Sequence, residues 1–135
     1  MKYGVVFATM AAASSWSALA QNYPERPVRV IVAQAPGGGT DSVTRLITQK
    51  FADAFNQSFV VDNRPGAGGN IAGEMAARAA PDGYTLLTVT PTHVINPSLY
   101  RKVLYDAIKD FAGVGQIVNA QYYLSVSNNT PAASV

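Results

Sequence analysis

Val28-Arg29-Val30-Ile31-Val32-Ala33 is a short run rich in β-branched residues, and the glycine-rich turn Pro36-Gly37-Gly38-Gly39 follows it closely. A run of this kind, bounded by Pro27 and by a turn, is typical of a strand. Apolar residues then recur at steps of three and four over residues 43–55, which predicts a helix that ends at about Asn56. The folded part of the chain is therefore expected to begin with a strand, a tight turn and a helix.

The same alternation of elements continues along the chain. Residues 59–62 are predicted as a second strand and residues 71–80 as an Ala-rich helix. Pro81-Asp82-Gly83 ends that helix as a turn, and residues 85–90 are predicted as a third strand. Strand, helix, strand, helix, strand at this spacing predicts the α/β class, with a mostly parallel, doubly wound sheet and right-handed crossovers.

The chain after the third strand is less regular. The pattern over residues 91–113 predicts one helical turn, near residues 97–100. Two later apolar runs, residues 115–118 and 122–126, are predicted as further strands.

The first twenty residues have the composition of a secretory signal peptide. Lys2 precedes an apolar run over residues 4–13, and Ala18-Leu19-Ala20 has the small-x-small pattern that signal peptidase cleaves. This run is shorter than the roughly 20 residues that a membrane-spanning helix needs. We therefore expect a signal peptide at residues 1–20, cleavage after Ala20, one mature domain at residues 21–135 and export to the periplasm.

Composition argues against several kinds of site. The 135 residues contain no cysteine and one histidine, His93, so neither a disulfide framework nor a metal site is expected. Ten basic residues against eight acidic ones, with no basic run longer than Arg101-Lys102, do not fit a nucleic-acid-binding surface. No cofactor is expected either. No Lys follows the first glycines as a P-loop requires, and Ser42 stands where the dinucleotide motif needs its third glycine.

The loops after the first and third predicted strands are the candidate site, because ligands of open parallel sheets bind beyond the carboxyl ends of the strands. In the first loop, three glycines leave backbone N–H groups exposed at a helix N-terminus, where the helix dipole favours an anion such as a carboxylate. Thr40 or Asp41 is expected to cap this helix with a side-chain oxygen. A tight turn that binds no ligand is the alternative.

The loop after the third strand carries neutral polar side chains, which are good partners for a carboxylate or a hydroxyl group. The dipeptide Asn96-Pro97 in this loop also fits a plain turn. In the loop before the second helix, Arg64 is predicted as a surface charge that packs against its own loop, with a carboxylate clamp as the alternative. The predicted ligand-binding residues are Pro36, Gly37, Gly38, Gly39, Thr40, Asp41, Thr90, Thr92, His93 and Asn96.

A hydrolase is the alternative function from a different class. Ser42, His93 and Asp41 supply the three residue types of a catalytic triad. Ser42, however, falls in the first turn of the predicted helix, and the sequence has no Gly-x-Ser-x-Gly motif. A polar-lined binding site without catalytic residues fits these side chains better, so the chain is not expected to be an enzyme.

Six segments in order closely resemble the tripartite tricarboxylate transporter receptors, also called the Bug family. The resemblance covers nearly all of residues 23–135. The segments are Tyr23-Pro24-x-Arg26-Pro27-Val28, Pro36-Gly37-Gly38-Gly39-Thr40-Asp41, Asp62-Asn63-Arg64-Pro65-Gly66-Ala67-Gly68-Gly69-Asn70-Ile71, Ala79-Ala80-Pro81-Asp82-Gly83-Tyr84-Thr85-Leu86-Leu87, Asn96-Pro97-Ser98-Leu99-Tyr100, and Tyr105-Asp106 through Asp110-Phe111.

The resemblance implies an extracytoplasmic solute-binding protein, expected to be a monomer, in which two α/β lobes close on a small organic anion. It implies that residues 36–41 and 90–96 line the cleft, that backbone amides and bridging waters hold the carboxylate of the ligand, and that the receptor delivers it to membrane permease subunits. Such receptors are more than twice as long as this chain, so most of the second lobe is expected to be missing. A truncated remnant that binds no ligand is the alternative.

The chain departs from the family pattern in two places. Gln34 and Ala35 precede the glycine loop where apolar and aromatic residues are usual, which predicts a change in ligand choice. Ala107 and Gly113 stand where the family usually has proline, so a looser segment is expected there.

Overall fold

The structure is a computed structural model that describes residues 23–121, 123 and 125–127, so the predicted signal peptide lies outside the described residues. None of the described helices is long and apolar enough to cross a membrane. The elements, in chain order, are β1 (Val28–Val32), α1 (Gly39–Phe55), β2 (Phe59–Asn63), the short 3-10 helix η1 (Ala67–Gly69), α2 (Asn70–Ala77), β3 (Thr85–Thr88) and α3 (Thr92–Leu99).

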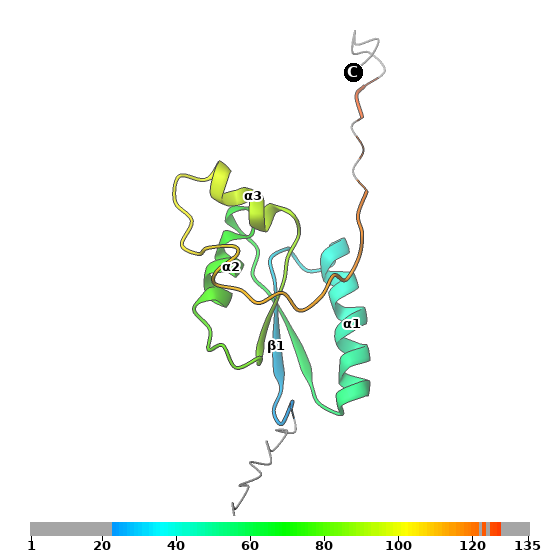
Figure 1. The fold of residues 1–135 in the computed structure, drawn as a ribbon. Coiled ribbons are helices and arrows are strands. Elements are labelled where there is room, and N and C mark those ends of the chain that lie inside the picture. The colour runs from blue at the N-terminus through cyan, green and yellow to red at the C-terminus, as the bar shows by residue number, and fades with distance from the viewer. Residues whose placement is uncertain (1–22, 122, 124, 128–135) are drawn as a thin grey trace, which may run out of the picture.

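The three strands form one parallel sheet in the order β2-β1-β3. β1 is therefore the central strand, and the chain adds β2 at one of its edges before it adds β3 at the other. α1 packs on β1 and β2, while α2 packs on β1 and β3, and the two helices lie on opposite sides of the sheet (Figure 1). This arrangement confirms the predicted α/β class and the parallel, doubly wound topology.

The core is centred on β1. Val28, Ile31 and Val32 are 0% exposed because β1 has a neighbouring strand at each edge and helices over both faces. All five residues of β1 pair with β2, and Arg29 to Val32 also pair with β3. A strand enclosed in this way reads as a continuous apolar run, which is why its sequence predicted it so directly.

The buried face of α1 is polar. Thr44 and Thr48 are 2% and 6% exposed, and their hydroxyls donate to the carbonyls of Thr40 and Arg45 at 2.7 and 3.0 Å. The apolar stripe predicted over residues 43–55 is therefore not the face that the sheet buries: Leu46 on that stripe is 66% exposed. A threonine can be buried in a helix at low cost because its hydroxyl bonds to the preceding turn.

α3 is a full helix where only one turn was predicted, and it contains Pro97. Proline has no N–H, so it cannot donate to the carbonyl four residues earlier, which belongs to His93. The hydroxyl of Tyr105 donates to that carbonyl instead, at 3.2 Å. A distant side chain thus replaces the missing helix bond, which a local pattern could not reveal.

The two further strands predicted near the end of the chain are not formed in the part of it that the structure describes. Residues 115–118 belong to no strand, and Ile117 and Val118 are exposed. Of the second predicted strand, residues 122 and 124 lie outside the described residues, and Tyr123 and Val126 are exposed and unpaired. A strand needs a neighbouring strand to accept its hydrogen bonds, and this segment runs past α1 and away from the sheet (Figure 1).

Tyr105 also fixes the position of α2. Its ring is 6% exposed and lies against Gly73, where a Cβ atom would sit 2.6 Å from the nearest ring carbon. A distance below 3.0 Å requires the ring or the helix to move. Gly73 is therefore the residue that allows α2 to approach the segment after α3.

Replacing Gly73 with alanine is expected to lower the free energy of unfolding by up to about 2 kcal/mol. Overpacking of this kind typically destabilises by about 1–3 kcal/mol, and the better helix propensity of alanine offsets about 1 kcal/mol of that loss. Urea unfolding followed by circular dichroism measures the difference. Gly113→Ala is the matched control, because nothing lies within 4 Å of a Cβ at that position. Equal effects of the two substitutions would contradict the close packing of Gly73 on Tyr105.

Candidate functional site

The loops after all three strands meet at the carboxyl edge of the sheet, around Gln34. The side-chain Nε2 of Gln34, just after β1, donates to Thr90 Oγ1, after β3, at 3.3 Å. Asn63, at the end of β2, donates from Nδ2 to the backbone oxygen of Gln34 at 3.1 Å. At the start of α2, a Cβ on Gly69 would lie 3.2 Å from Ala33, so that helix also begins against the loop after β1.

The glycine loop of residues 36–39 is exposed and ends at the N-cap of α1, which is Gly38. No side chain caps this helix, so the expectation that Thr40 or Asp41 is the N-cap is wrong. The loop can reach this position because Gly37 has a φ of +80°, in the left-handed region that favours glycine. Within the loop, the N–H groups of Gly37 and Gly38 already donate, to Asp41 Oδ2 and to the carbonyl of Ala35. The N–H groups of the first helical turn, those of Gly39, Thr40 and Asp41, have no partner within the helix.

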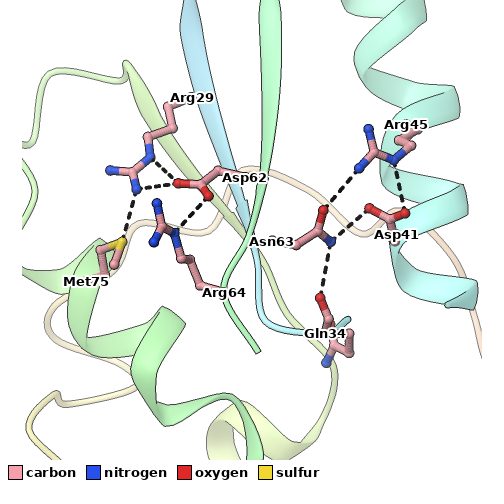
Figure 2. Close-up of polar contacts among 8 residues, drawn as sticks. All are labelled: Arg29, Gln34, Asp41, Arg45, Asp62, Asn63, Arg64 and Met75. Atoms are coloured by element: carbon pink, nitrogen blue, oxygen red, sulfur yellow. Dashed lines mark hydrogen bonds and ion pairs between the residues drawn. The ribbon is translucent and has the colours of Figure 1, made fainter. Parts of the chain in front are cut away.

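Asp41 lies inside the first turn of α1 and is 2% exposed. Its carboxylate accepts from Arg45 Nε at 3.0 Å and from Asn63 Nδ2 at 2.9 Å (Figure 2). It also accepts from the backbone N–H of Gly37 at 2.9 Å. The hydrogen bond from Arg45, followed by those from Gly37 and Asn63, lowers the pKa of Asp41 to about 2. The side chain that sequence reasoning expected at the helix cap instead ties the glycine loop to α1 and β2.

The polar side chains after β3 form a short chain of hydrogen bonds. Thr90 Oγ1 lies 2.8 Å from Thr92 Oγ1, and Thr92 is the first residue of α3. The N-cap of α3 is Pro91, and no side chain caps this helix. The N-cap of α2 is Gly69, and no side chain caps that helix either. Every α-helix of the described chain thus begins uncapped, after the carboxyl end of a strand.

His93 is held between two aromatic rings. Its imidazole stacks on Tyr105 with ring centroids 4.8 Å apart and an interplanar angle of 3°, and the ring of Phe111 meets it edge-on at 4.8 Å. Burial lowers the pKa of His93, which favours the neutral imidazole. The carboxylate of Asp41 makes its bonds to other groups, so the described contacts provide no Asp–His pair of the kind that a hydrolase triad uses.

Asn96 is 2% exposed and fastens α3 to the start of α2. Its Nδ2 donates to the carbonyl of Gly68 at 3.0 Å and to Asn70 Oδ1 at 2.8 Å. Asn70 also accepts from the hydroxyl of Tyr105 at 3.2 Å. The side-chain amide of Asn96, one of the predicted site residues, therefore makes its hydrogen bonds to other residues of the protein. The amides that sequence reasoning missed, Asn63 and Asn70, show no local signal because their side-chain partners lie at least 18 residues away.

Arg64, predicted as a surface charge that packs against its own loop, pairs instead with Asp62 of the preceding strand β2. Its Nε donates to Asp62 Oδ1 at 2.8 Å, and the other oxygen of Asp62 accepts from Arg29 (Figure 2). Burial alone would raise the pKa of Asp62, but the hydrogen bonds from Arg29 and Arg64 outweigh it, so the pKa is lowered. Asp62 and Asn63 are consecutive in β2 and point to opposite faces, so this ion pair is separate from the Asp41 cluster.

The Asp41 contacts predict a pH dependence of stability. Since the pKa of Asp41 falls from 3.8 to about 2 on folding, its contribution is fully present above pH 4 and is lost as the pH falls toward 2. We expect Asp41→Asn to be less stable than the wild type above pH 4, with a difference that shrinks toward pH 2. Urea unfolding at several pH values measures it, and the other carboxylates cancel because both proteins contain them. A difference that does not change between pH 5 and pH 2 would contradict this role.

Comparison with known proteins adds to these observations. The profile described as "Tripartite tricarboxylate transporter family receptor" matches residues 43–135. A UPF0065 protein of Bordetella bronchiseptica is 39% identical over 111 residues, which are 82% of this chain and 33% of that protein. The protein BugT of Bordetella pertussis is 36% identical over 116 residues, which are 84% of this chain and 35% of that protein. The chain thus spans about a third of the length of these relatives.

Solved structures with the same fold include the periplasmic binding protein BugD, with a TM-score of 0.63 and 40% identity over 66% of this chain and 30% of that one. MatC of Rhodopseudomonas palustris with bound malate has a TM-score of 0.62 and 43% identity, over 66% of this chain and 31% of that one. Rpa4515 of R. palustris with adipate has a TM-score of 0.61 and 42% identity, over 63% of this chain and 29% of that one. By its sequence and by its fold, the chain belongs to the tripartite tricarboxylate transporter receptor family.

Proposed function

We propose that this chain forms the first α/β lobe of an extracytoplasmic receptor that binds a small organic carboxylate and delivers it to the permease subunits of a tripartite transporter. Residues 1–20 act as the signal peptide, residues 21–135 form the mature domain, and the site of action is the periplasm. Family membership supports this proposal, as do the related structures with bound malate and adipate.

The observation that carries the proposal is the exposed glycine loop at the uncapped start of α1. The N–H groups of Gly39, Thr40 and Asp41, where the loop enters α1, and the positive end of the helix dipole favour an anion without any basic side chain. Asp41 is the one carboxylate in the turn. Arg45 balances its negative charge, and two neutral donors also bond to it, so Asp41 does not repel a second anion from the site. Pro36, Gly37, Gly38, Gly39 and Thr40 are the proposed ligand-binding residues of this loop.

The other half of the proposed site lies at the start of α3. Thr90 and Thr92 contribute hydroxyls that can donate to a ligand or accept from it. The hydrogen bond from Gln34 to Thr90 joins this half of the site to the loop after β1. His93 and Asn96 form the support of this half: the first stacks on Tyr105, and the second holds α3 on α2. Asp41 has the same supporting role in the first loop.

The affinity expected of this chain alone is modest. A charge-assisted hydrogen bond contributes about 1.5–3 kcal/mol, and two or three of them must also offset the cost of immobilising the ligand. A dissociation constant of about 1 mM corresponds to about 4 kcal/mol. One lobe that leaves the ligand in contact with water is therefore expected to bind no tighter than roughly millimolar.

Malate and adipate at about 10 mM are expected to raise the melting temperature of the residue 21–135 protein. With a dissociation constant of about 1 mM, mass action adds about 1.4 kcal/mol to the free energy of unfolding, which corresponds to a rise of several degrees. Differential scanning fluorimetry measures the shift, and glycerol at the same concentration is the neutral comparison. Absence of a dose-dependent shift would favour a remnant that binds no ligand.

Gly38→Asp tests the location of the site. An aspartate at the N-cap brings its own carboxylate to the N–H groups of α1, so it should abolish the response to carboxylates while keeping or slightly raising the melting temperature of the free protein. Gly38 has an extended conformation and its Cβ would lie 3.4 Å from the nearest atom, so the substitution fits. Gly113→Asp adds the same charge in open space and should leave the response unchanged. A full response in Gly38→Asp would place the ligand elsewhere.

A further inference from the structure

Gln34, which follows β1, is hydrogen-bonded to the end of β2 and to the loop after β3, and only one end of its side-chain amide, Nε2, has a hydrogen-bond partner. Nε2 donates to Thr90 Oγ1 at 3.3 Å, a long hydrogen bond. Oε1 is buried, and no donor among the described residues reaches it. It is the only buried side-chain nitrogen or oxygen without a partner in the part of the chain that the structure describes.

A buried acceptor without a donor is uncommon, and it marks a place where a partner is missing. The side chains already bonded to Gln34 are engaged elsewhere: Thr90 Oγ1 is paired with Thr92 Oγ1, and the amide of Asn63 donates to Asp41 and to the backbone of Gln34. The terminal torsion of glutamine has a broad energy profile, so the amide can turn to meet a new partner at low cost.

Gln34 stands between the two halves of the proposed site. Asn63 and Asp41 connect it to the glycine loop, and Thr90 connects it to the start of α3. An ionised carboxylate has no hydrogen to donate, so the anion itself cannot satisfy Oε1. A hydroxyl group on a carbon next to the carboxylate can donate to Oε1 while the carboxylate stays on the backbone N–H groups of the loop.

We propose that Gln34 determines ligand specificity and selects hydroxycarboxylates over carboxylates that lack the hydroxyl group. The inference rests on the proposed function, because it assigns a ligand class to that same site. An enclosed site that must pair a buried polar group can reject the analogue that lacks the matching group by several orders of magnitude. Here only one lobe covers the ligand, so water still competes for the polar groups of the ligand and the expected preference is smaller, about three- to tenfold.

Malate and succinate provide the test, because they differ by one hydroxyl group. Titration of the ¹⁵N-labelled residue 21–135 protein, followed by two-dimensional NMR, measures millimolar dissociation constants directly. The wild type is expected to bind malate about three- to tenfold more tightly than succinate. Gln34→Leu, which keeps the size of the side chain and removes the amide, is expected to reduce the ratio to less than about twofold. Gln49→Leu, the same change at an exposed position of α1, should keep the wild-type ratio.

A second readout needs no variant. The side-chain amide resonances of Gln34 are expected to shift when malate is added and to shift much less with succinate at equal occupancy. Equal affinities in the wild type, a ratio that persists in Gln34→Leu, or unperturbed Gln34 resonances would each overturn the assignment and leave the proposed function standing. If neither acid binds the wild type, the proposed function fails and this inference fails with it.

Discussion

The carboxylate of Asp41 is the group on which the rest of the site depends. It accepts from the backbone of the glycine loop, from Arg45 on its own helix and from Asn63 at the end of β2. Charge-assisted hydrogen bonds are stronger than neutral ones, and burial keeps water from competing for these. The loop is therefore held beside the sheet by a residue inside the helix, and the start of α1 stays uncapped. One interaction both stabilises the fold and leaves the N–H groups available.

A second set of contacts holds the other half of the site in place. Tyr105 donates to the carbonyl that Pro97 leaves unpaired, its ring fills the space beside Gly73, and His93 stacks on it. Asn96 adds two hydrogen bonds to the loop before α2. Because these contacts share members, α2, α3 and the segment around Tyr105 behave as one packed unit. The loop after β3 is thus supported by groups that follow it in the chain.

The proposed site presents no unpaired charge to a ligand. Basic side chains near it are already paired: Arg45 with Asp41, and Arg29 and Arg64 with Asp62. What remains toward a ligand are backbone N–H groups, two hydroxyls and the amide of Gln34. A carboxylate bound by such neutral groups is selected by the positions of donors and acceptors, so small changes around it alter which acid is preferred. This agrees with a family whose solved members include one with malate and one with adipate.

Local sequence was enough to predict the three parallel strands, the helix after each of the first two and the exposed glycine loop. Strand and turn signals act over a few residues, and β1, with its turn, carries them without interruption. The loops of the site followed from the general rule that ligands meet parallel sheets at the carboxyl ends of strands, and the family followed from six short segments in order.

Only the tertiary structure decided how these pieces are used. Asp41 and Asn63 are 22 residues apart, so no local pattern showed that Asp41 supports the loop rather than caps the helix. The hydrophobic period predicted a different buried face for α1 from the one observed, which contains Thr44 and Thr48. These threonines can be buried because their hydroxyls donate to carbonyls of the same helix. Likewise, residues 115–118 have the composition of a strand, but a strand forms only where another strand accepts its hydrogen bonds. Sequence determined the elements, and pairing between distant residues determined which groups were left free for a ligand.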